Sequence, residues 1–359
     1  MATPVQASVQ GRQAPSPDRP WLIGLAVLVV IGIVAWIAQL AAGFDVLGVG
    51  QSIAWGVYIA TFFLLAGAGS GLLLGSATTD LGFLPEMAEH RRSLLVGALA
   101  CYIAAGFAVL MDIGQPLRAL EMIYSPNFKS MFVWDFYLLG LSVILTLVCL
   151  LRRPGSKRVA GLAAAAAVLL LLVEGAILAV TAGTPLWHSG LIPVMFLVEG
   201  VVTAISLVLL KRGAATSSGE RMRRTLTALL PVLLVCTLVE MVAVLYGGDA
   251  DAAAAMKMLA AGSFAPMYWG QLVLGIVVPF AIFAGPSVAR GNIRVAAVLA
   301  IAGVFVAKMN LLVAGRALPF MGTPTSYTPS VVEIGGLIGL VGLAALLYVL
   351  GKRVLPLQA

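Results

Sequence analysis

Ten apolar runs of about 20 residues recur along this chain, and they limit its fold more than any other feature. A helix of about 20 residues is long enough to cross a bilayer core of about 30 Å. Charged residues make up 10% of the 359 residues, whereas a soluble domain carries about a quarter. We therefore expect an all-α, polytopic transmembrane protein. The expected spans are 21–42, 52–78, 92–113, 131–151, 158–182, 190–211, 224–247, 267–286, 294–316 and 331–350.

The basic residues predict how the chain is oriented, because cytoplasmic loops of membrane proteins carry an excess of Lys and Arg. With ten spans, 17 of the 22 basic residues fall in the two tails and in the four loops on the same side. Both termini are therefore expected in the cytoplasm. The membrane that the chain spans is expected to be the cytoplasmic (inner) membrane of a bacterium or archaeon. The 17 residues are Arg12, Arg19, Arg91, Arg92, Arg152, Arg153, Lys157, Arg158, Lys211, Arg212, Arg221, Arg223, Arg224, Arg290, Arg294, Lys352 and Arg353.

The domain organisation follows from these spans. The polar residues 1–19 are expected to form a disordered cytoplasmic tail, 20–351 the transmembrane domain, and 352–359 a second cytoplasmic tail. The spans suggest two four-helix bundles with peripheral helices. The expected parts of the transmembrane domain are an extra first span at 20–51, a first bundle at 52–182, a second bundle at 183–316 and a last span at 317–351.

Cysteine and histidine are too few and too scattered to hold a metal centre. Cys101, Cys149 and Cys236 lie singly inside apolar runs, without the spacing of an iron–sulphur site. The only histidines, His90 and His188, are expected on opposite sides of the membrane, whereas a bis-histidine haem needs two at a similar depth. We therefore expect neither a haem nor an iron–sulphur cluster in this chain.

The stretch between the third and fourth spans, DIGQPLRALEMIYSPNFKSMFVWD at 112–135, concentrates charge at a membrane boundary. Its prolines prevent either helix from continuing through it. Charges near lipid normally line a cavity or contact a partner. We expect this segment to cap a site on the extracytoplasmic face, where the longer loops lie and where a partner docks.

Several motifs in order resemble the NrfD/PsrC-type family of quinone-interacting membrane subunits. They are GQPLRAL followed by SPNFKSMFVWD, then PLWHSGLIPVMFLVEG, then YTPSVVEIGGLIG with a C-terminal KRVLP. The resemblance covers nearly the whole chain from about residue 52. It implies a quinone, menaquinone or ubiquinone, as cofactor. It also implies electron exchange with a ferredoxin-like iron–sulphur subunit on the outer face. That subunit would pass electrons to or from either a catalytic subunit, for which molybdopterin is one cofactor option, or a cytochrome subunit.

By this resemblance the quinone pocket lies in the first bundle near the outer face. A quinone site needs an apolar slot, donors to the two carbonyl oxygens and groups that exchange protons. The expected catalytic residues are Asp112, Asp135 and His188. The expected quinone-binding residues are Trp55, Tyr58, Gly71, Arg118, Asn127, Ser130, Trp134 and Tyr137.

Four ionisable residues inside the expected spans are candidates for proton transfer: Glu174, Glu199, Glu240 and Lys308. A buried lysine needs a carboxylate partner, and Glu199 or Glu240 is expected to supply it. The inner half of the spans offers hydroxyl groups, so protons from quinol are expected to leave on the outer side.

Structural roles are the alternative for many of these residues. Tryptophans at 55, 134 and 187 suit an interfacial belt, Asp112 and Arg118 suit an ion pair, and Asp135 suits the start of a helix. His188 also suits an ordinary loop. Two other functions stay open: a proton- or ion-coupled secondary transporter that uses Glu199, Glu240 and Lys308, and an assembly protein without a quinone site.

Overall fold

The computed structural model describes residues 19–50, 53–152, 156–181, 183–184, 186–285, 290–316 and 327–354. Over these residues all regular secondary structure is helical, and ten of the helices are long and apolar enough to cross a membrane. The expected all-α, ten-span fold is therefore confirmed. Most of the two expected tails and the loop at 317–326 lie outside the described residues.

The helices follow one another with short connections. In chain order they are α1 (Arg19–Ala42), η1 (Gly43–Val46), α2 (Val57–Asp80), η2 (Pro85–His90), α3 (Arg91–Asp112), η3 (Pro116–Leu120), α4 (Glu121–Tyr124), α5 (Met131–Leu151), α6 (Lys157–Ala179), α7 (Leu191–Arg212), α8 (Ser217–Tyr246), α9 (Ala250–Ala261), α10 (Ala265–Leu272), η4 (Val273–Val277), α11 (Val278–Ala284), α12 (Arg290–Met309), η5 (Asn310–Ala314) and α13 (Val331–Val354).

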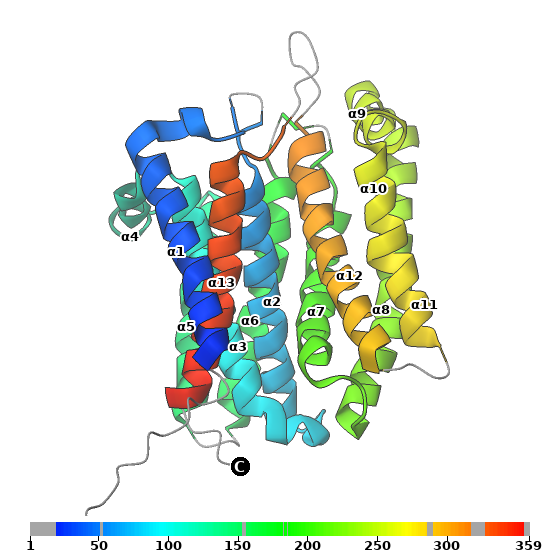
Figure 1. Ribbon diagram of the computed structural model, residues 1–359. Coiled ribbons are helices and arrows are strands. Elements are labelled where there is room, and N and C mark those ends of the chain that lie inside the picture. Colours follow the sequence, from blue (N-terminus) through cyan, green and yellow to red (C-terminus); the bar gives the residue numbers. More distant parts are fainter. Residues whose placement is uncertain are drawn as a thin grey trace, which may run out of the picture.

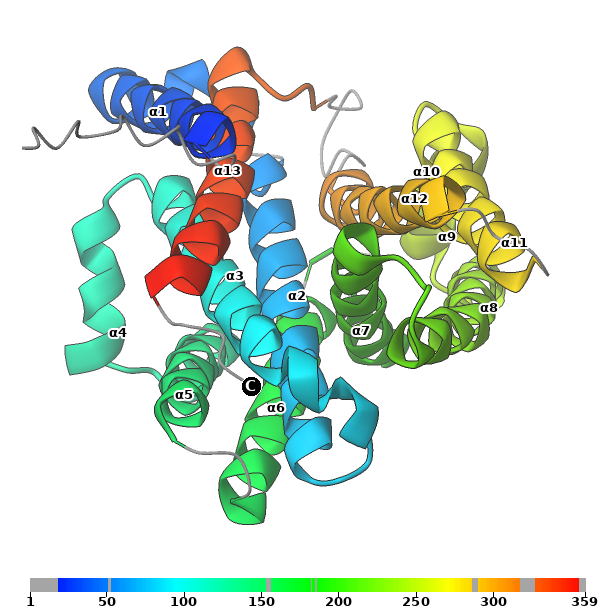
Figure 2. The same cartoon turned by 60° about the horizontal axis from the view of Figure 1, so that its bottom comes forward.

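The long helices stand side by side in two groups (Figures 1 and 2). Helices α2, α3, α5 and α6 pack together, and α7, α8, α10–α11 and α12 form the second group. Helix α7 packs against α2 and α6, so it joins the groups. The helix ends near Asp80 and Arg212 form what we call the basic end. The opposite end carries α4 and α9, and we call it the loop end. The domain boundaries expected from the sequence stay a prediction.

The first and last spans pair with each other on one side of the molecule (Figure 2). A Cβ atom added to Gly32 would lie 2.5 Å from the Cα of Gly339, so only glycine allows the two backbones to approach this closely. Helix α13 also packs on α3, whereas α1 is largely exposed and presents its apolar residues to lipid. The pair therefore covers the outside of the first group.

Two π-helical turns, η4 and η5, interrupt the spans of the second group. Pro279 lies just after η4 and lacks the backbone N–H that would donate to the carbonyl four residues back in an α-helix. The regular backbone hydrogen-bond pattern is therefore interrupted there. The spans of η4 and η5 touch at Gly275 and Gly303, where an added Cβ would meet backbone at 2.5 Å or closer. The polar residues Gln271, just before η4, and Asn310, the first residue of η5, are buried.

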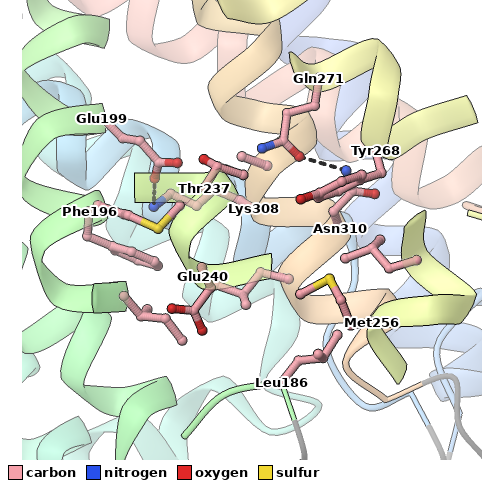
Figure 3. Close-up of a pocket in the computed structure, with 15 residues that line it drawn as sticks. Leu186, Phe196, Glu199, Thr237, Glu240, Met256, Tyr268, Gln271, Lys308 and Asn310 are labelled. Atoms are coloured by element: carbon pink, nitrogen blue, oxygen red, sulfur yellow. Dashed lines mark hydrogen bonds and ion pairs between the residues drawn. The ribbon is translucent and has the colours of Figure 1, made fainter. Parts of the chain in front are cut away.

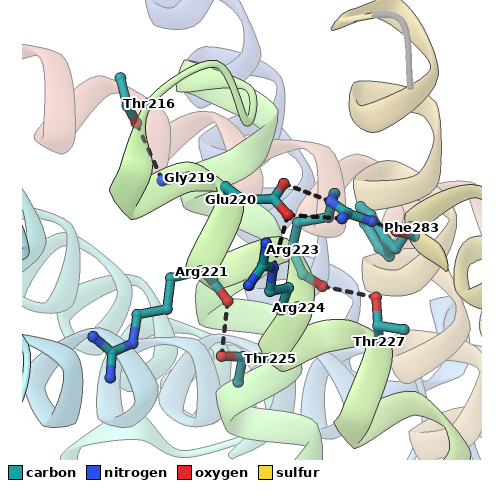
Figure 4. Close-up of polar contacts among 9 residues, drawn as sticks. All are labelled: Thr216, Gly219, Glu220, Arg221, Arg223, Arg224, Thr225, Thr227 and Phe283. Atoms are coloured by element: carbon teal, nitrogen blue, oxygen red, sulfur yellow. Dashed lines mark hydrogen bonds and ion pairs between the residues drawn. The ribbon is translucent and has the colours of Figure 1, made fainter. Parts of the chain in front are cut away.

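Helix α8 begins at Ser217, about two turns before the expected start at 224 (Figure 4). Thr216 caps it, because its hydroxyl accepts a hydrogen bond from Gly219 N at 3.1 Å. Glu220 in the first turn pairs with Arg223 at 2.8 Å and with Arg224 at 2.9 Å. The arginines attributed to a loop therefore belong to a helix, and they still lie at the basic end.

Candidate functional site

A group of polar side chains from α2, α3, α13 and the segment just before α13 lies at the loop end of the first group. We call Tyr58, Asp112, Tyr327 and Glu333 the loop-end cluster. Tyr58 lies on α2 and is 2% exposed, and its hydroxyl donates to the carbonyl of Val332 at 3.3 Å. Asp112, the last residue of α3, is half-buried and lies within electrostatic range of both Tyr58 and Glu333.

Glu333 is the most connected member of the cluster, and it was not among the expected site residues. One carboxylate oxygen accepts from Gly48 N at 2.7 Å and from Ser330 N at 2.8 Å, and the other accepts from the Tyr327 hydroxyl at 2.7 Å. Glu333 N in turn bonds Ser330 Oγ at 3.2 Å. This reciprocal pair is a capping box, and its Ser-x-x-Glu signature before an apolar run is visible in the sequence.

Tyr327 lies just before the last span and connects the cluster to α2. Its hydroxyl accepts from Val57 N at 3.1 Å while it donates to Glu333. Burial, reinforced by the adjacent Glu333 carboxylate, raises the pKa of Tyr327 well above its usual range. The phenol therefore stays protonated and remains a hydrogen-bond donor.

Aromatic rings from both helix groups meet beside the start of α2. Trp55 stacks on Trp187 with ring centroids 5.4 Å apart and planes 11° apart, and Phe132 packs edge-on against Trp55 at 5.6 Å. Trp187 is fully buried and donates to the Leu311 carbonyl at 2.8 Å. Its neighbour His188 is exposed. The stacked rings therefore pack together inside the protein, and His188 is not part of this packing.

The residues expected to bind quinone between η3 and α5 mostly hold their own segment together. Trp134 Nε1 donates to the Phe128 carbonyl at 3.0 Å, and the Tyr137 hydroxyl donates to the Met122 carbonyl at 3.2 Å. Asn127 Oδ1 accepts from Lys129 N at 3.2 Å in the turn before α5. These contacts fold α4 back onto the first turns of α5.

Two other members of that segment also make local contacts. Ser130 N donates to the Asn127 carbonyl at 2.9 Å, and Ser130 precedes the first residue of α5. Arg118 pairs with Glu121 at 3.0 Å and is exposed, so this ion pair replaces the alternative pair with Asp112.

Gly71 lies far from the loop-end residues. It is 13 residues beyond Tyr58 on α2, which is about 20 Å along the helix. A Cβ atom there would lie 2.4 Å from the Gly200 carbonyl oxygen, so glycine lets α2 and α7 pack closely. The structure gives Gly71 a packing role at the contact between the two groups.

Two buried carboxyl groups lie together between α5 and α6. Glu174 is fully buried, and Asp135 is 7% exposed. Glu174 lies within electrostatic range of Asp135 and of Lys308. Among the described residues, neither oxygen of Glu174 nor Oδ1 of Asp135 has a hydrogen-bond partner. Buried carboxyl groups that are left without partners in a membrane span are costly, which favours a functional reason for them. The structure therefore separates Asp135 from the cluster that contains Asp112.

A buried ion pair lies in the second group, where Lys308 on α12 donates to Glu199 on α7 (Figure 3). Glu199 is one of the two partners expected for this lysine. The other, Glu240, instead accepts from the Ser189 hydroxyl at 2.6 Å. These side chains line a cavity of about 80 Å³ together with Thr237, Tyr268, Gln271 and Asn310. Asn310 donates to Gln271 at 2.8 Å.

No three His, Cys, Asp or Glu side chains within the described ranges gather as metal ligands do. The loop-end cluster instead offers phenols, carboxyl groups and adjacent aromatic rings. These suit a neutral, partly aromatic ligand that exchanges protons and accepts hydrogen bonds.

The fold and the buried polar groups define a multi-pass helical membrane protein. Residues 45–319 match the family described as polysulphide reductase, NrfD, and the chain belongs to this family. This confirms the resemblance found in the sequence motifs.

Three relatives match along almost all of the chain. A Halobacterium salinarum protein, named as the membrane subunit of a dimethyl sulfoxide reductase, is 30% identical, with 95% of this chain and 92% of the relative covered. The integral membrane subunit of an Hdr-like menaquinol oxidoreductase from Archaeoglobus fulgidus is 25% identical, with 94% and 92% covered. A subunit of the selenate reductase from Mesobacillus selenatarsenatis is 20% identical, with 92% of each covered.

Proposed function

We propose that this chain is the membrane subunit of a quinol-dependent oxidoreductase complex. It exchanges electrons between the quinone pool and an iron–sulphur partner on the extracytoplasmic face, and the partner connects to a catalytic subunit. The observation that carries the proposal is the NrfD family match over residues 45–319. The relatives, which match over nine-tenths of the chain, are named as subunits of a menaquinol oxidoreductase, a dimethyl sulfoxide reductase and a selenate reductase, which supports it.

We infer that the quinone headgroup binds at the loop-end cluster. A bound quinol supplies two electrons and two protons there. Tyr58, whose hydroxyl donates to the Val332 carbonyl in this structure, would turn its proton toward a carbonyl oxygen of the oxidised quinone, and Asp112 would take up a proton from the quinol. Glu333, held by four hydrogen bonds, keeps Tyr327 and the start of α13 in place around them. Asp135 and His188 remain our proposals for a second proton acceptor and a donor at the same face.

The other expected binding residues support the site from one side. Trp55, with Trp187 stacked on it, lies just before α2, the helix that carries Tyr58. Asn127, Ser130, Trp134 and Tyr137 hold together the segment that follows Asp112 and leads into α5. Arg118 is exposed on that segment and is available to a partner with an acidic surface.

Protons leave the site through the buried ionisable groups of the loop-end half. Glu174 lies within electrostatic range of both Asp135 and Lys308, and Lys308 pairs with Glu199 in the second group. Glu240 lies on the same cavity and bonds Ser189 near the loop end. We propose that this order of groups, from α5 to α8, carries protons to the extracytoplasmic side with water in the cavity.

The orientation of the chain gives the first testable expectation. The basic end faces the cytoplasm, because positive loops are retained there. Reporter fusions after Arg152 and after Arg224 should therefore read as cytoplasmic, and a fusion within 114–130 should read as extracytoplasmic. The opposite pattern would place the loop-end cluster on the cytoplasmic side and would contradict a partner on the extracytoplasmic face.

The cavity in the second group also bears on the alternative of a secondary transporter. Its volume of about 80 Å³ suits a few water molecules, whereas sites for small organic ligands span about 300–1,000 Å³. The size of this cavity favours proton transfer over the transport of an organic solute.

Purification of the chain from its native membrane tests the proposed function. We expect a cluster-bearing subunit and endogenous quinone to copurify with it, and quinol to reduce the partner's cluster anaerobically. A chain that copurifies with the partner but without quinone, and whose partner quinol does not reduce, would be an assembly protein. A chain that purifies alone and moves an ion or solute in liposomes would be a transporter. Either result would overturn the proposal.

A further inference from the structure

The cavity in the second helix group holds more polar side chains than the Lys308–Glu199 pair requires (Figure 3). Its volume of about 80 Å³ has room for a small cation with a few water molecules. Three elements supply the additional polar groups: α8 with Thr237 and Glu240, α10 with Tyr268 and Gln271, and η5 with Asn310. Residues three apart lie on the same face of a helix, so α8 and α10 each present two polar side chains to the cavity.

Two of these side chains carry oxygen atoms without a hydrogen-bond partner. Tyr268 and Asn310 are each 3% exposed, and among the described residues neither the Tyr268 hydroxyl nor Asn310 Oδ1 has a partner. Asn310 donates to Gln271 through its amide nitrogen, which leaves Oδ1 free to bind another group. Buried polar atoms are normally paired, so each exception needs an explanation. Both residues line the cavity, and an occupant that binds oxygen atoms explains both exceptions together.

Glu240 adds a negative charge that no cation balances within the described part of the chain. Lys308 is already paired with Glu199, and none of the ion pairs includes Glu240. The hydroxyl of Ser189 donates to one of its two oxygens. A carboxylate inside a membrane span is costly without a positive partner. Tyr268 lies within electrostatic range of Glu240, so the unpartnered phenol and the unbalanced carboxylate belong to one site.

The helices that line this cavity are interrupted beside it. Gln271 lies two residues before the π-helical turn η4, and Asn310 is the first residue of η5. Such turns are frequent at functional sites, and irregular backbone at membrane depth is tolerated where it lines a cavity. Interrupted helices also hold Na⁺ or protons in secondary transporters. The backbone and the side chains therefore point to the same kind of occupant.

We propose that this cavity binds one monovalent alkali cation, with Glu240 as its charged ligand and Tyr268 and Asn310 as neutral oxygen ligands. Hard cations prefer oxygen ligands, and a single carboxylate balances a single positive charge. Thr237 and Gln271 supply further oxygens from the same helix faces. The Thr237 hydroxyl donates to a backbone carbonyl of its own helix at 2.9 Å, which leaves its lone pairs for the cation.

A proton on Glu240 would neutralise the same carboxylate, so the cation and a proton exclude each other there. The cation site goes beyond the proposed function and does not depend on it.

The test measures Na⁺ bound to the complex purified in mild detergent, after exchange into a buffer in which choline replaces Na⁺ and K⁺. Titration with radioactive Na⁺ should show saturable binding of about one ion for each copy of the chain, because the site has one unbalanced carboxylate. Na⁺ should also raise the thermal-unfolding midpoint, because a ligand that binds the folded state stabilises it. The midpoint in choline buffer shows whether each variant is folded.

Two variants remove ligands with little change in size. Glu240→Gln removes the charge and should weaken Na⁺ binding by at least about 10-fold. Tyr268→Phe removes one neutral oxygen and should weaken it by about 3- to 10-fold. Asp251→Asn changes an exposed carboxylate on α9 at the same end of the molecule, and it should bind Na⁺ as the unchanged chain does.

Absence of saturable Na⁺ binding would overturn the proposal and would leave Glu240 balanced by a proton. Unchanged Na⁺ binding in Glu240→Gln would also overturn it, as would choline chloride that raises the midpoint as much as the same concentration of NaCl. None of these measurements uses quinol, so a failure of the proposed function would not alter their outcome.

Discussion

Replacing Lys308 with methionine is expected to destabilise the folded chain by about 3–5 kcal/mol, the usual cost of removing one partner of a buried ion pair. Lys308 and Glu199 are 2% and 3% exposed, and the lysine also lies over the Phe196 ring. Without the ammonium group, the Glu199 carboxylate would remain in a low-dielectric interior with no cation to offset its lost hydration. Thermal unfolding of the purified protein in detergent should show a large decrease in midpoint.

A matched pair of variants separates the charge from the packing. Lys257→Met changes an exposed lysine on α9 and should alter stability by no more than about 0.5 kcal/mol. Glu199→Leu/Lys308→Met replaces both charges with apolar groups and should recover most of the lost stability, because apolar replacement of a whole buried pair is often neutral. A double variant as unstable as Lys308→Met would contradict this explanation and would assign the loss to packing.

The spans could be predicted from the sequence because their physical cause is local. Each is a run of apolar residues of membrane length, and helix α5 occupies 131–151, the range expected for it. The start of α8 was wrong because basic residues suggest loops, whereas Thr216 and Glu220 extend the helix through them. Helix α9 had a readable signal, since Asp249 caps the alanine-rich stretch that follows with bonds to Asp251 N and Ala252 N.

The candidate site was less predictable, because periodicity does not reveal which spans are neighbours. The sequence places Asp112 and Asp135 in one segment, yet the fold puts them in different surroundings. Glu174 joins Asp135 only because α6 packs beside α5. The pairing of Lys308 with a glutamate could be expected from the cost of burying a charge, but the choice of Glu199 depends on α7 lying against α12.

Glu333 was missed although the sequence contained its signal. The capping box at Ser330 and Glu333 marks the start of α13, and it also places a buried carboxylate beside Tyr58 and Asp112. Glu333 therefore both caps a helix and contributes a carboxylate to the candidate site. Gly71, in contrast, was expected to bind quinone, but in the structure it allows close packing of two helices.

The second large effect is expected at Asp112. Asparagine keeps the size and hydrogen-bonding ability of this side chain but removes its capacity to accept a proton. If Asp112 accepts a proton from quinol, Asp112→Asn should lower quinol turnover by about 10² or more, the usual scale for a positioned acid or base. Assembly with the partner should persist, because none of the hydrogen bonds that hold Glu333 involves Asp112.

The measurement is anaerobic quinol oxidation by the purified complex, with the reduction of the partner's iron–sulphur cluster as the readout. Asp45→Asn, which changes an exposed carboxylate on η1 at the same end, serves as the control and should keep full turnover. Our account predicts that Asp112→Asn retains the partner at normal stoichiometry and loses turnover. Full turnover in Asp112→Asn, or loss of the partner with normal specific activity in the complex that remains, would contradict a quinol site at the loop-end cluster.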